Sequence, residues 1–490
     1  MWVGARKLLH GSPTQVCGIS TVGTHGRRNS PVEASRDVDA SSGFGAVSRM
    51  PSPGGCILPR MRADDPFLDR YAHGTRAMTA SEIRALFAVA ARPEIVSLAG
   101  GMPFTAALPL DVVGDVMSEV LAKEGPAALQ YGGGQGDPRL REVLVDLMRR
   151  EGIHASGGDI VVTAGSQQAL DLLARMFCDP GDVIVAEGPS YVGALSAFSQ
   201  YQAQVRHVRL DDDGLDPDEL NDELHRLSAE GRRVKFLYTV PNFHNPAGVT
   251  LSDERRDRVV EIARRHDVLI LEDNPYGMLG FESDPPTTLR GRDPDNVVYL
   301  GTVSKTFCPG LRIGWVLAPP AISERLVLVK EAADLCSSNF AQAVAYRYFA
   351  DYPWQQTLKA LRDVYRERRN VLLDSLSEDF PTEVTWTHPQ GGFYVWVRLP
   401  ERLDAKAMLA KAITARVAYV PGGSFFANGQ GSSFLRLSYC FPPPDRIREG
   451  VRRLAGVVEE ELDLLRALGG LRAPTDEPEA AGPAAWGGVQ

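Results

Sequence analysis

The chain lacks the features that mark membrane, extracellular and metal-binding proteins. No apolar run approaches the ~20 residues of a membrane-spanning helix. The six cysteines are scattered, without a C-x-x-C pair or a cysteine–histidine cluster. These absences argue against a disulfide framework and a zinc site, and they favour a reducing, cytoplasmic compartment. Basic residues do not dominate either: the formal net charge of −9 argues against nucleic acid or an anionic membrane as the main partner.

Both ends of the chain differ in composition from the rest. Residues 1–62 are rich in Gly, Ser, Pro and Arg, and residues 471–490 in Pro, Ala, Glu and Gly, so both segments are predicted to be disordered. Up to Val32 the chain has basic but no acidic residues, which is the bias of an organellar transit peptide. We prefer to interpret residues 1–62 as an upstream extension, because Gly and Pro make a poor amphipathic helix.

Strands and helices are predicted to alternate from residue 160, which is typical of an α/β domain with a largely parallel sheet. Apolar runs predict strands at 160–163, 183–186, 205–210, 234–240, 268–271 and 297–300. A long helix at 339–375, short strands and a closing helix at 444–468 predict a smaller α+β unit. The expected parts are a disordered extension (1–62), an N-terminal arm with part of the small domain (63–110), a large domain (111–338), a small domain (339–470) and a disordered tail (471–490).

Several predicted strands are followed by side chains that could bind a phosphorylated ring, and in a parallel sheet these strand ends meet at one edge. Gly165-Ser166-Gln167 opens a predicted helix, whose free N–H groups and hydroxyl suit an anion. Tyr191 follows the next strand and could stack on a flat ring. Asp273 follows the apolar run 268–271, where an unpaired carboxylate would be costly. Alone, most of these motifs also fit a helix cap, a surface aromatic or a turn, so the prediction depends on their joint occurrence.

A lysine lies in the segment Val298–Trp315, whose apolar start predicts a buried strand. The strand leads into Thr302 and Ser304, Lys305 follows at once, and Arg312 comes seven residues later. An amine with hydroxyls before it and a guanidinium after it suits a Schiff base beside a bound phosphate. An isolated Ser-Lys pair would instead be read as a solvated loop.

Together the motifs resemble those of fold-type I pyridoxal-phosphate (PLP) enzymes. The resemblance is to the class I/II aminotransferases, and within them to the 2-aminoadipate and kynurenine aminotransferase II branch. It covers about residues 70–465 and rests on S-L-A-G-G-M-P (97–103), L-Q-Y-G (129–132), G-S-Q-Q (165–168), P-N-F-H-N-P-A-G (241–248), E-D-N-P-Y (272–276), S-K (304–305), P-G-L-R-I-G (309–314) and F-L-R-L-S-Y (434–439). It implies a large domain with a mostly parallel sheet flanked by helices, plus a smaller α+β domain. Ala247 replaces the usual Thr and Thr302 the commoner Ser, and neither change removes an expected PLP contact.

The resemblance also implies roles for single residues. Lys305 would hold PLP as a Schiff base and then serve as general base and acid, and Asp273 would keep the pyridine nitrogen protonated. Further cofactor contacts are expected from Ser166, Gln167, Tyr191, Asn245, Tyr276, Thr302, Ser304 and Arg312, with Tyr131 reaching the phosphate of the neighbouring subunit in a homodimer. Substrate contacts are expected from Arg436, Gly101, Asn245 and Arg84. Arg436 would clamp the α-carboxylate, whereas Arg84 fits a solvated helix position equally well.

Three functions are compatible with this resemblance. An aminotransferase would move the α-amino group of a 2-aminoadipate, aromatic or aliphatic donor to a 2-oxo acid, with 2-oxoglutarate the expected acceptor, by a ping-pong route. A lyase or decarboxylase could use the same site. An effector-sensing regulator would carry a helix-turn-helix, and residues 1–62 show no such pattern. We prefer the aminotransferase. The sequence does not identify the amino donor, because Phe393, Tyr394 and Trp396 could line an aromatic pocket or belong to the core.

Overall fold

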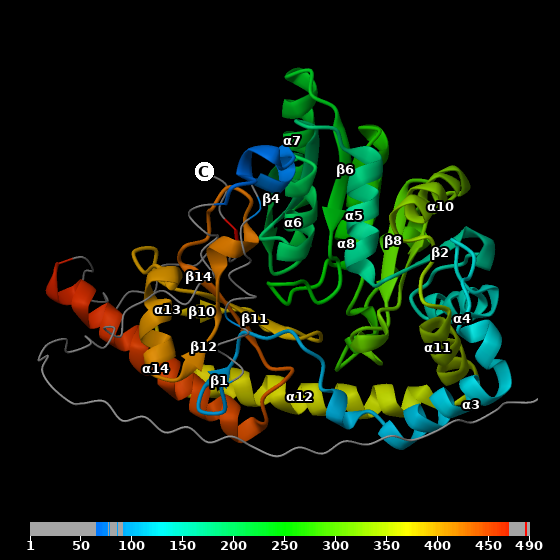
Figure 1. Ribbon diagram of the computed structural model, residues 1–490. Coiled ribbons are helices and arrows are strands. Elements are labelled where there is room, and N and C mark those ends of the chain that lie inside the picture. The colour runs from blue at the N-terminus through cyan, green and yellow to red at the C-terminus, as the bar shows by residue number, and fades with distance from the viewer. Residues whose placement is uncertain (1–64, 77, 79–85, 87–91, 470–485, 488–490) are drawn as a thin grey trace, which may run out of the picture. The chain divides into compact units, whose positions relative to one another are not determined.

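The computed structural model describes residues 65–76, 78, 86, 92–469 and 486–487 (Figure 1). Residues 1–62 and most of 471–490, for which the composition predicts disorder, lie outside the described residues, and so does Arg84. Trp486 and Gly487 are described, and both are buried. The domain boundaries given above remain predictions from the sequence.

An eight-stranded sheet forms the centre of the larger part of the fold. Its strands lie in the order β2 (Ile160–Thr163), β9 (Gly314–Leu317), β8 (Val297–Thr302), β7 (Leu269–Asp273), β6 (Val234–Thr239), β3 (Val183–Gly188), β4 (Gln204–Asp211) and β5 (Gly214–Leu215). β9 is antiparallel to both of its neighbours and β5 is antiparallel to β4, whereas the other adjacent pairs are parallel. The predicted α/β class with a mostly parallel sheet is therefore confirmed.

Helices cover both faces of this sheet, which explains why its strands are continuously apolar. Along β3, Ile184 and Ala186 pack in one core cluster with α5 and α6, while Val183 and Val185 pack in another with α7 and α8. Figure 1 shows these helices flanking the sheet. The helices of this part are α3 (Leu110–Ala128), α4 (Pro138–Arg149), α5 (Ser166–Phe177), α6 (Val192–Gln200), α7 (Pro217–Ala229), α8 (Asp253–Arg265), α9 (Leu289–Arg292) and α10 (Pro320–Asp334), with the short α1 (His73–Arg76) before them.

Two strands extend past the apolar runs that predict them. β7 continues to Asp273 and β8 to Thr302, so hydrogen bonds of the sheet fix the backbone at both polar residues. The short β9 is not among the predicted strands, although its apolar residues follow Arg312. In a run of four residues, an alternation of apolar and polar side chains is too short to distinguish a strand from a buried loop.

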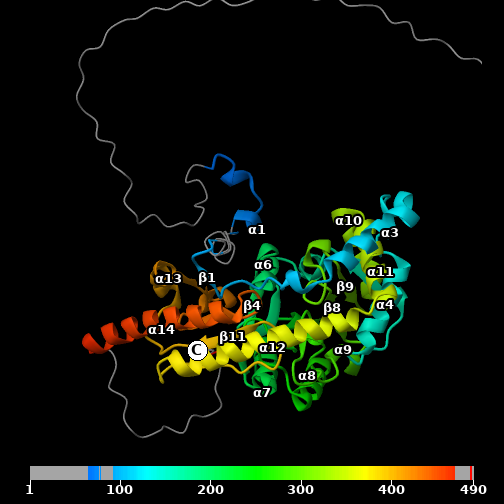
Figure 2. The same cartoon turned by 90° about the horizontal axis from the view of Figure 1, so that it is seen from below.

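A four-stranded antiparallel sheet forms the smaller part. Its strands lie in the order β10 (Thr385–Trp386), β11 (Tyr394–Arg398), β14 (Phe434–Ser438) and β13 (Val420–Pro421). Nearby, β1 (Val96–Ser97) pairs in parallel with β12 (Val417–Ala418), so the N-terminal segment joins this part of the chain. Figure 2 shows α12 (Trp354–Asp379) and α14 (Pro444–Ala467) packed side by side, with α13 (Ala405–Thr414) beyond them.

The long helix predicted at 339–375 is instead two helices, α11 (Asn339–Asp351) and α12. Tyr352 between them is extended, with φ −118° and ψ 153°, and Pro353 precedes the first turn of α12. A proline disfavours helical geometry in the residue before it, and this local effect overrides the continuous apolar pattern. Among the helices of the described residues, none is long and apolar enough to cross a membrane.

Candidate active site

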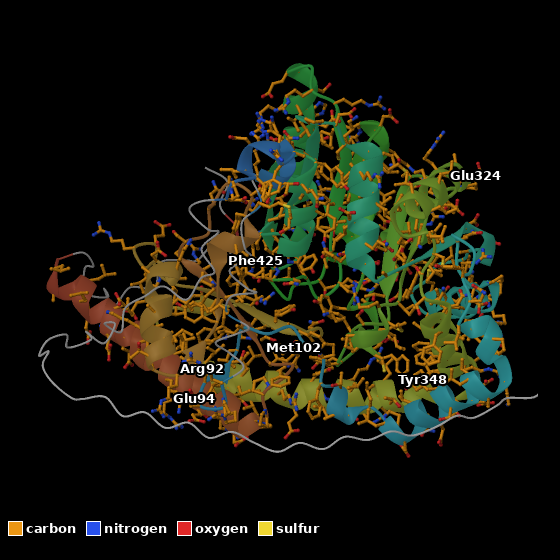
Figure 3. All side chains as sticks on the ribbon, viewed as in Figure 1. Arg92, Glu94, Met102, Glu324, Tyr348 and Phe425 are labelled. Carbon is orange, nitrogen blue, oxygen red and sulfur yellow. The ribbon has the colours of Figure 1, made fainter. Side chains whose placement is uncertain are left out.

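A cavity of about 540 Å³ lies at the carboxyl ends of the parallel strands and is bordered by residues of both sheets. Met102, labelled in Figure 3, lines it from the segment that follows β1. The cavity is within the size range of small-molecule sites. Most of the site residues expected from the sequence line it, namely Gly101, Ser166, Gln167, Tyr191, Asn245, Asp273, Tyr276, Thr302, Ser304, Lys305, Arg312 and Arg436. The structure thus brings together side chains that are far apart in the sequence.

Among the described residues, one expected site residue, Tyr131, does not line this cavity. Tyr131 is 78% exposed and lines a second cavity of about 510 Å³, together with Cys336 and Phe340. Because its side chain is exposed in the single chain, Tyr131 could contact another subunit. Arg84 lies outside the described residues, so its contact with substrate remains a prediction.

Lys305 follows β8 and projects into the cavity. Its Nζ donates a hydrogen bond of 3.2 Å to the carbonyl oxygen of Gly101, and the rings of Tyr276 and Phe393 lie 6.0 and 5.6 Å from it. Burial among these groups lowers the pKa of the Lys305 amine from 10.5 to about 8. A substantial fraction of the amine is therefore neutral near pH 8, and only a neutral amine can act as a nucleophile or accept a proton.

Asp273 is the last residue of β7, and only one of its two carboxylate oxygens is hydrogen-bonded within the part of the chain that the structure describes. Its Oδ2 accepts a hydrogen bond of 3.0 Å from the hydroxyl of Tyr238, while its buried Oδ1 has no hydrogen-bond partner among the described residues. Burial raises the pKa of this carboxyl from 3.8 to about 7. An unpaired buried carboxylate oxygen is costly unless a ligand supplies a donor, and a protonated ring nitrogen fits this requirement.

An anion site lies at the start of α5. Gly165 precedes the helix with φ 78°, and a Cβ there would lie 2.3 Å from Nη2 of Arg312. Glycine therefore lets the guanidinium approach the helix N-terminus, where it donates a hydrogen bond of 3.0 Å to the carbonyl of Ala164. Thr302 and Ser304 line the same cavity, and their hydroxyl oxygens are 2.9 Å apart. Free helix N–H groups, a guanidinium and hydroxyls together suit a phosphate.

A second cationic group faces the cavity from the small sheet. Arg436 on β14 is 3% exposed and donates hydrogen bonds of 2.8 Å to Oδ1 of Asn245 and to the carbonyl of Ala99. Its buried Nε has no partner in the part of the chain that the structure describes. The ring of Tyr394 lies 4.2 Å from the guanidinium carbon and the ring of Phe425 lies 5.1 Å from it. The two hydrogen bonds fix the Arg436 guanidinium and leave its Nε–H available to a ligand.

The structure shows which of the aromatic residues Phe393, Tyr394 and Trp396 line the cavity, and it adds one tyrosine that the sequence did not predict. Tyr394 lines the cavity, with its hydroxyl 3.4 Å from that of Tyr276, whereas Phe393 and Trp396 are fully buried in core clusters. Tyr238, the partner of Asp273, was not anticipated. It lies inside an apolar strand, where the sequence carries no signal to distinguish a hydrogen-bonding tyrosine from a packing one. No group of three or more His, Cys, Asp or Glu within the described ranges could hold a metal ion.

A lysine of lowered pKa, a carboxylate with a free oxygen and an anion site at a helix N-terminus define the pocket of a PLP-dependent enzyme of fold type I. The family model for aminotransferase class I and II matches residues 94–454, and the chain belongs to this family. It is therefore a PLP-dependent aminotransferase, which confirms the family, the cofactor and the reaction class expected from the motifs. It transfers amino groups between amino acids and 2-oxo acids.

Three similar proteins illustrate the range of amino acids named for members of this family. The chain is 43% identical to aromatic-amino-acid aminotransferase 1 of Thermococcus litoralis, over 80% of this chain and 94% of that one. It is 35% identical to 2-aminoadipate transaminase of Thermus thermophilus, over 81% and 98% of the two chains. A solved structure of Pyrococcus horikoshii kynurenine aminotransferase matches with a TM-score of 0.78 and 40% identity, covering 81% of this chain and 98% of that one.

Proposed function

We propose that this aminotransferase takes amino donors with aromatic or 2-aminoadipate-like side chains and passes the amino group to 2-oxoglutarate. One observation carries this proposal: Arg436, with a free Nε, faces the same cavity as Lys305 and lies against the ring of Tyr394. A guanidinium in this place can bind the α-carboxylate of an amino acid whose α-carbon is near Nζ of Lys305. The names of the relatives, which act on aromatic amino acids, 2-aminoadipate and kynurenine, support the choice of donors.

The proposed roles of the residues follow from their positions. When bound, PLP supplies an electron sink for the negative charge that develops at the substrate α-carbon. Nζ of Lys305 accepts the α-proton of the donor and returns a proton to the α-carbon of the new amino acid, and its lowered pKa suits both steps. Oδ1 of Asp273 holds the proton of the ring nitrogen.

The remaining cavity residues bind and orient the cofactor. The phosphate is held by the N-terminus of α5 and by Arg312, with hydroxyl and amide groups of Ser166, Gln167, Thr302 and Ser304. Tyr191 would pack on the ring, and Asn245 and Tyr276 would donate hydrogen bonds to its phenolic oxygen. Each of these groups lines the cavity already described. A rigid arrangement of this kind favours reaction because little reorganisation is needed at the moment of proton transfer.

A homodimer with shared active sites is part of the proposal. Tyr131 is exposed in the single chain, as are the apolar residues Leu110, Leu121 and Leu129 on and just beyond α3. Exposed apolar side chains clustered on one element favour burial against another subunit. Tyr131 would then reach the phosphate held by the neighbouring subunit. We also propose a cytoplasmic location, which the unpaired state of the cysteines in the described part of the chain supports.

A donor screen tests the proposed reaction. Purified holoenzyme is mixed with phenylalanine, kynurenine, 2-aminoadipate, leucine or alanine, and the visible absorption of the cofactor is followed. We expect the absorption to change with aromatic donors and 2-aminoadipate and to recover when 2-oxoglutarate is added. Release of a shortened carbon product without any need for a 2-oxo acid would show a lyase or decarboxylase instead.

A further inference from the structure

The C-terminal residues Trp486 and Gly487, here called the C-terminal anchor, are packed into the fold although they lie beyond the family match that ends at residue 454. Trp486 is 2% exposed and belongs to a core cluster that includes Leu210, Trp396 and Phe425. A tryptophan buries a large apolar area and its indole N–H requires an acceptor. The surrounding residues supply the apolar contacts and the acceptor, so the anchor is held at a specific place in the fold.

On the side of the large sheet, the anchor binds the end of β4. The backbone N–H of Trp486 donates a hydrogen bond of 2.9 Å to the carbonyl of Leu210, and its indole Nε1 donates one of 2.7 Å to Oδ1 of Asp212. Gly487 lies against Gly188 at the end of β3, where an added Cβ would be 1.9 Å from the carbonyl oxygen of Gly188. These contacts leave no space for a side chain at position 487.

On the side of the small sheet, the anchor contacts the residues that support Arg436. The indole Nε1 of Trp396 donates a hydrogen bond of 3.2 Å to the carbonyl of Trp486. Trp396 is the direct cross-strand partner of Arg436, and such partners lie on the same face of a sheet. Phe425, labelled in Figure 3, packs in the same cluster as Trp486, and its ring lies 5.1 Å from the Arg436 guanidinium.

The same contacts lead to the residue that faces the cofactor ring. The backbone N–H of Ser190 donates a hydrogen bond of 2.8 Å to the carbonyl of Phe425, and Tyr191 follows directly. The segment from Gly188 to Tyr191 is therefore held between the anchor at one end and Phe425 in the middle. The anchor thus touches the supports of Tyr191 on one sheet and of Arg436 on the other.

We propose that the C-terminal anchor is a positioning element that joins the two sheets and sets the distance between Tyr191 and Arg436, and thereby the affinity for the amino donor. Trp486 and Gly487 touch neither substrate nor cofactor; they act through Trp396, Phe425 and Gly188. Loss of supporting contacts can misplace binding groups by about 1 Å, which lowers the efficiency of a site by up to about 100-fold. The inference rests on the proposed role of Arg436 as the carboxylate clamp.

The test compares full-length holoenzyme with four variants in steady-state assays of donor KM and kcat and in a separate measurement of the rate of PLP release. Trp486→Ala and a chain ending at Gly469 are expected to raise the donor KM about tenfold and to speed PLP release, with kcat within about twofold of the parent. Trp486→Phe keeps an aromatic ring and the backbone bond, and it loses the Asp212 contact and part of the buried ring area, so its KM should rise less than about threefold. A chain ending at Gly487 is the matched control and should equal the parent.

A lowered melting temperature with unchanged KM and unchanged PLP release in Trp486→Ala and in the chain ending at Gly469 would overturn the inference, because the anchor would then be structural only. A fall in kcat of more than about twofold in Trp486→Ala with an unchanged donor KM would also overturn it. Arg436→Ala in the full-length chain separates this failure from that of the proposed function. If Arg436→Ala leaves the donor KM unchanged, the clamp is wrong; if it raises KM and the anchor variants do not, the anchor is wrong.

Discussion

The hydroxyl of Tyr238 donates a 3.0 Å hydrogen bond to one oxygen of Asp273, and the other oxygen of Asp273 is buried without a partner in the described part of the chain. The two residues lie on adjacent parallel strands, β6 and β7. Tyr238 therefore orients the carboxylate and leaves its second oxygen unpaired among the described residues, which is the oxygen that we propose for the ring nitrogen of PLP. Substitution of Asp273 should therefore lower kcat much more than substitution of Tyr238.

Asp273→Asn is expected to lower kcat at least about 100-fold, because a neutral amide cannot hold a proton on the ring nitrogen and a shift of two pKa units corresponds to about 2.7 kcal/mol. PLP should still bind, since its phosphate contacts are intact. Tyr238→Phe should lower kcat by less than about tenfold, because it removes one hydrogen bond and leaves the charge. Steady-state kinetics on both holoenzymes measures the difference, and equal losses would contradict the assignment of Asp273.

Lys305→Ala should abolish turnover, with a loss of at least about 1,000-fold, because no other amine lies within reach of the substrate α-carbon among the cavity residues. The variant should retain PLP bound without a covalent link, which dialysis and absorption spectra can show. Turnover at the wild-type rate in this variant would refute the proposed site as a whole.

Covalent attachment of PLP to the apoenzyme should become faster as the pH rises from 6 to 9, with a midpoint near 8. The reason is the lowered pKa of Lys305, about 8: below this pH the amine is protonated and has no lone pair, and above it the neutral form predominates. An ordinary lysine would place the midpoint more than two units higher. Stopped-flow absorption measures the rate, and a profile still rising steeply at pH 10 would contradict the lowered pKa.

Arg436 and Arg312 should have separable roles. Arg436→Lys is expected to raise the donor KM at least tenfold, because an ammonium group cannot form the paired hydrogen bonds of a guanidinium and charge-assisted bonds contribute about 1.5–3 kcal/mol. Arg312→Lys should instead weaken PLP binding and leave the donor KM of the saturated holoenzyme within about twofold. Titration with PLP and donor kinetics distinguish the two; exchanged effects would reverse the assignment.

Tyr131 should act in the site of a neighbouring subunit. Mixed dimers of Lys305→Ala and Tyr131→Ala chains contain one site with both residues intact, so an equal mixture should recover roughly a quarter of wild-type activity. Each parent alone should be far less active. Activity no greater than the average of the two parents would show that Tyr131 serves its own subunit or none.

The sequence points to several residues that line the cavity, because they lie where buried strands end. Asp273 and Thr302 are the last residues of β7 and β8 and Lys305 follows β8, and a parallel sheet brings such strand ends together whatever their separation in the chain. The contact of Tyr238 with Asp273 could not be predicted in this way, and the sequence left open whether Tyr394 lines a pocket or packs in the core, because a tyrosine of a buried strand can do either. Their roles depend on which face of the strand they occupy and on what lies opposite, and that is set by tertiary packing.

Two further features were missed for different physical reasons. The break between α11 and α12 depends on one proline, whose local geometry overrides an apolar pattern that continues through it. The burial of Trp486 depends on contacts with Leu210, Trp396 and Phe425, which come from distant parts of the chain. Composition alone made residues 471–490 look disordered, since a single tryptophan among Pro, Ala and Gly gives no periodicity from which packing could be predicted.

Lys305 and Arg312 lie on a single connection between β8 and β9, whose ends are paired at Thr302 and Gly314. The spacing between Lys305 and Arg312 is thus fixed within one hairpin of the large sheet, whereas Arg436 belongs to the small sheet. A shift of the small sheet would therefore change the distance from Arg436 to Lys305 without changing the distance from Lys305 to Arg312.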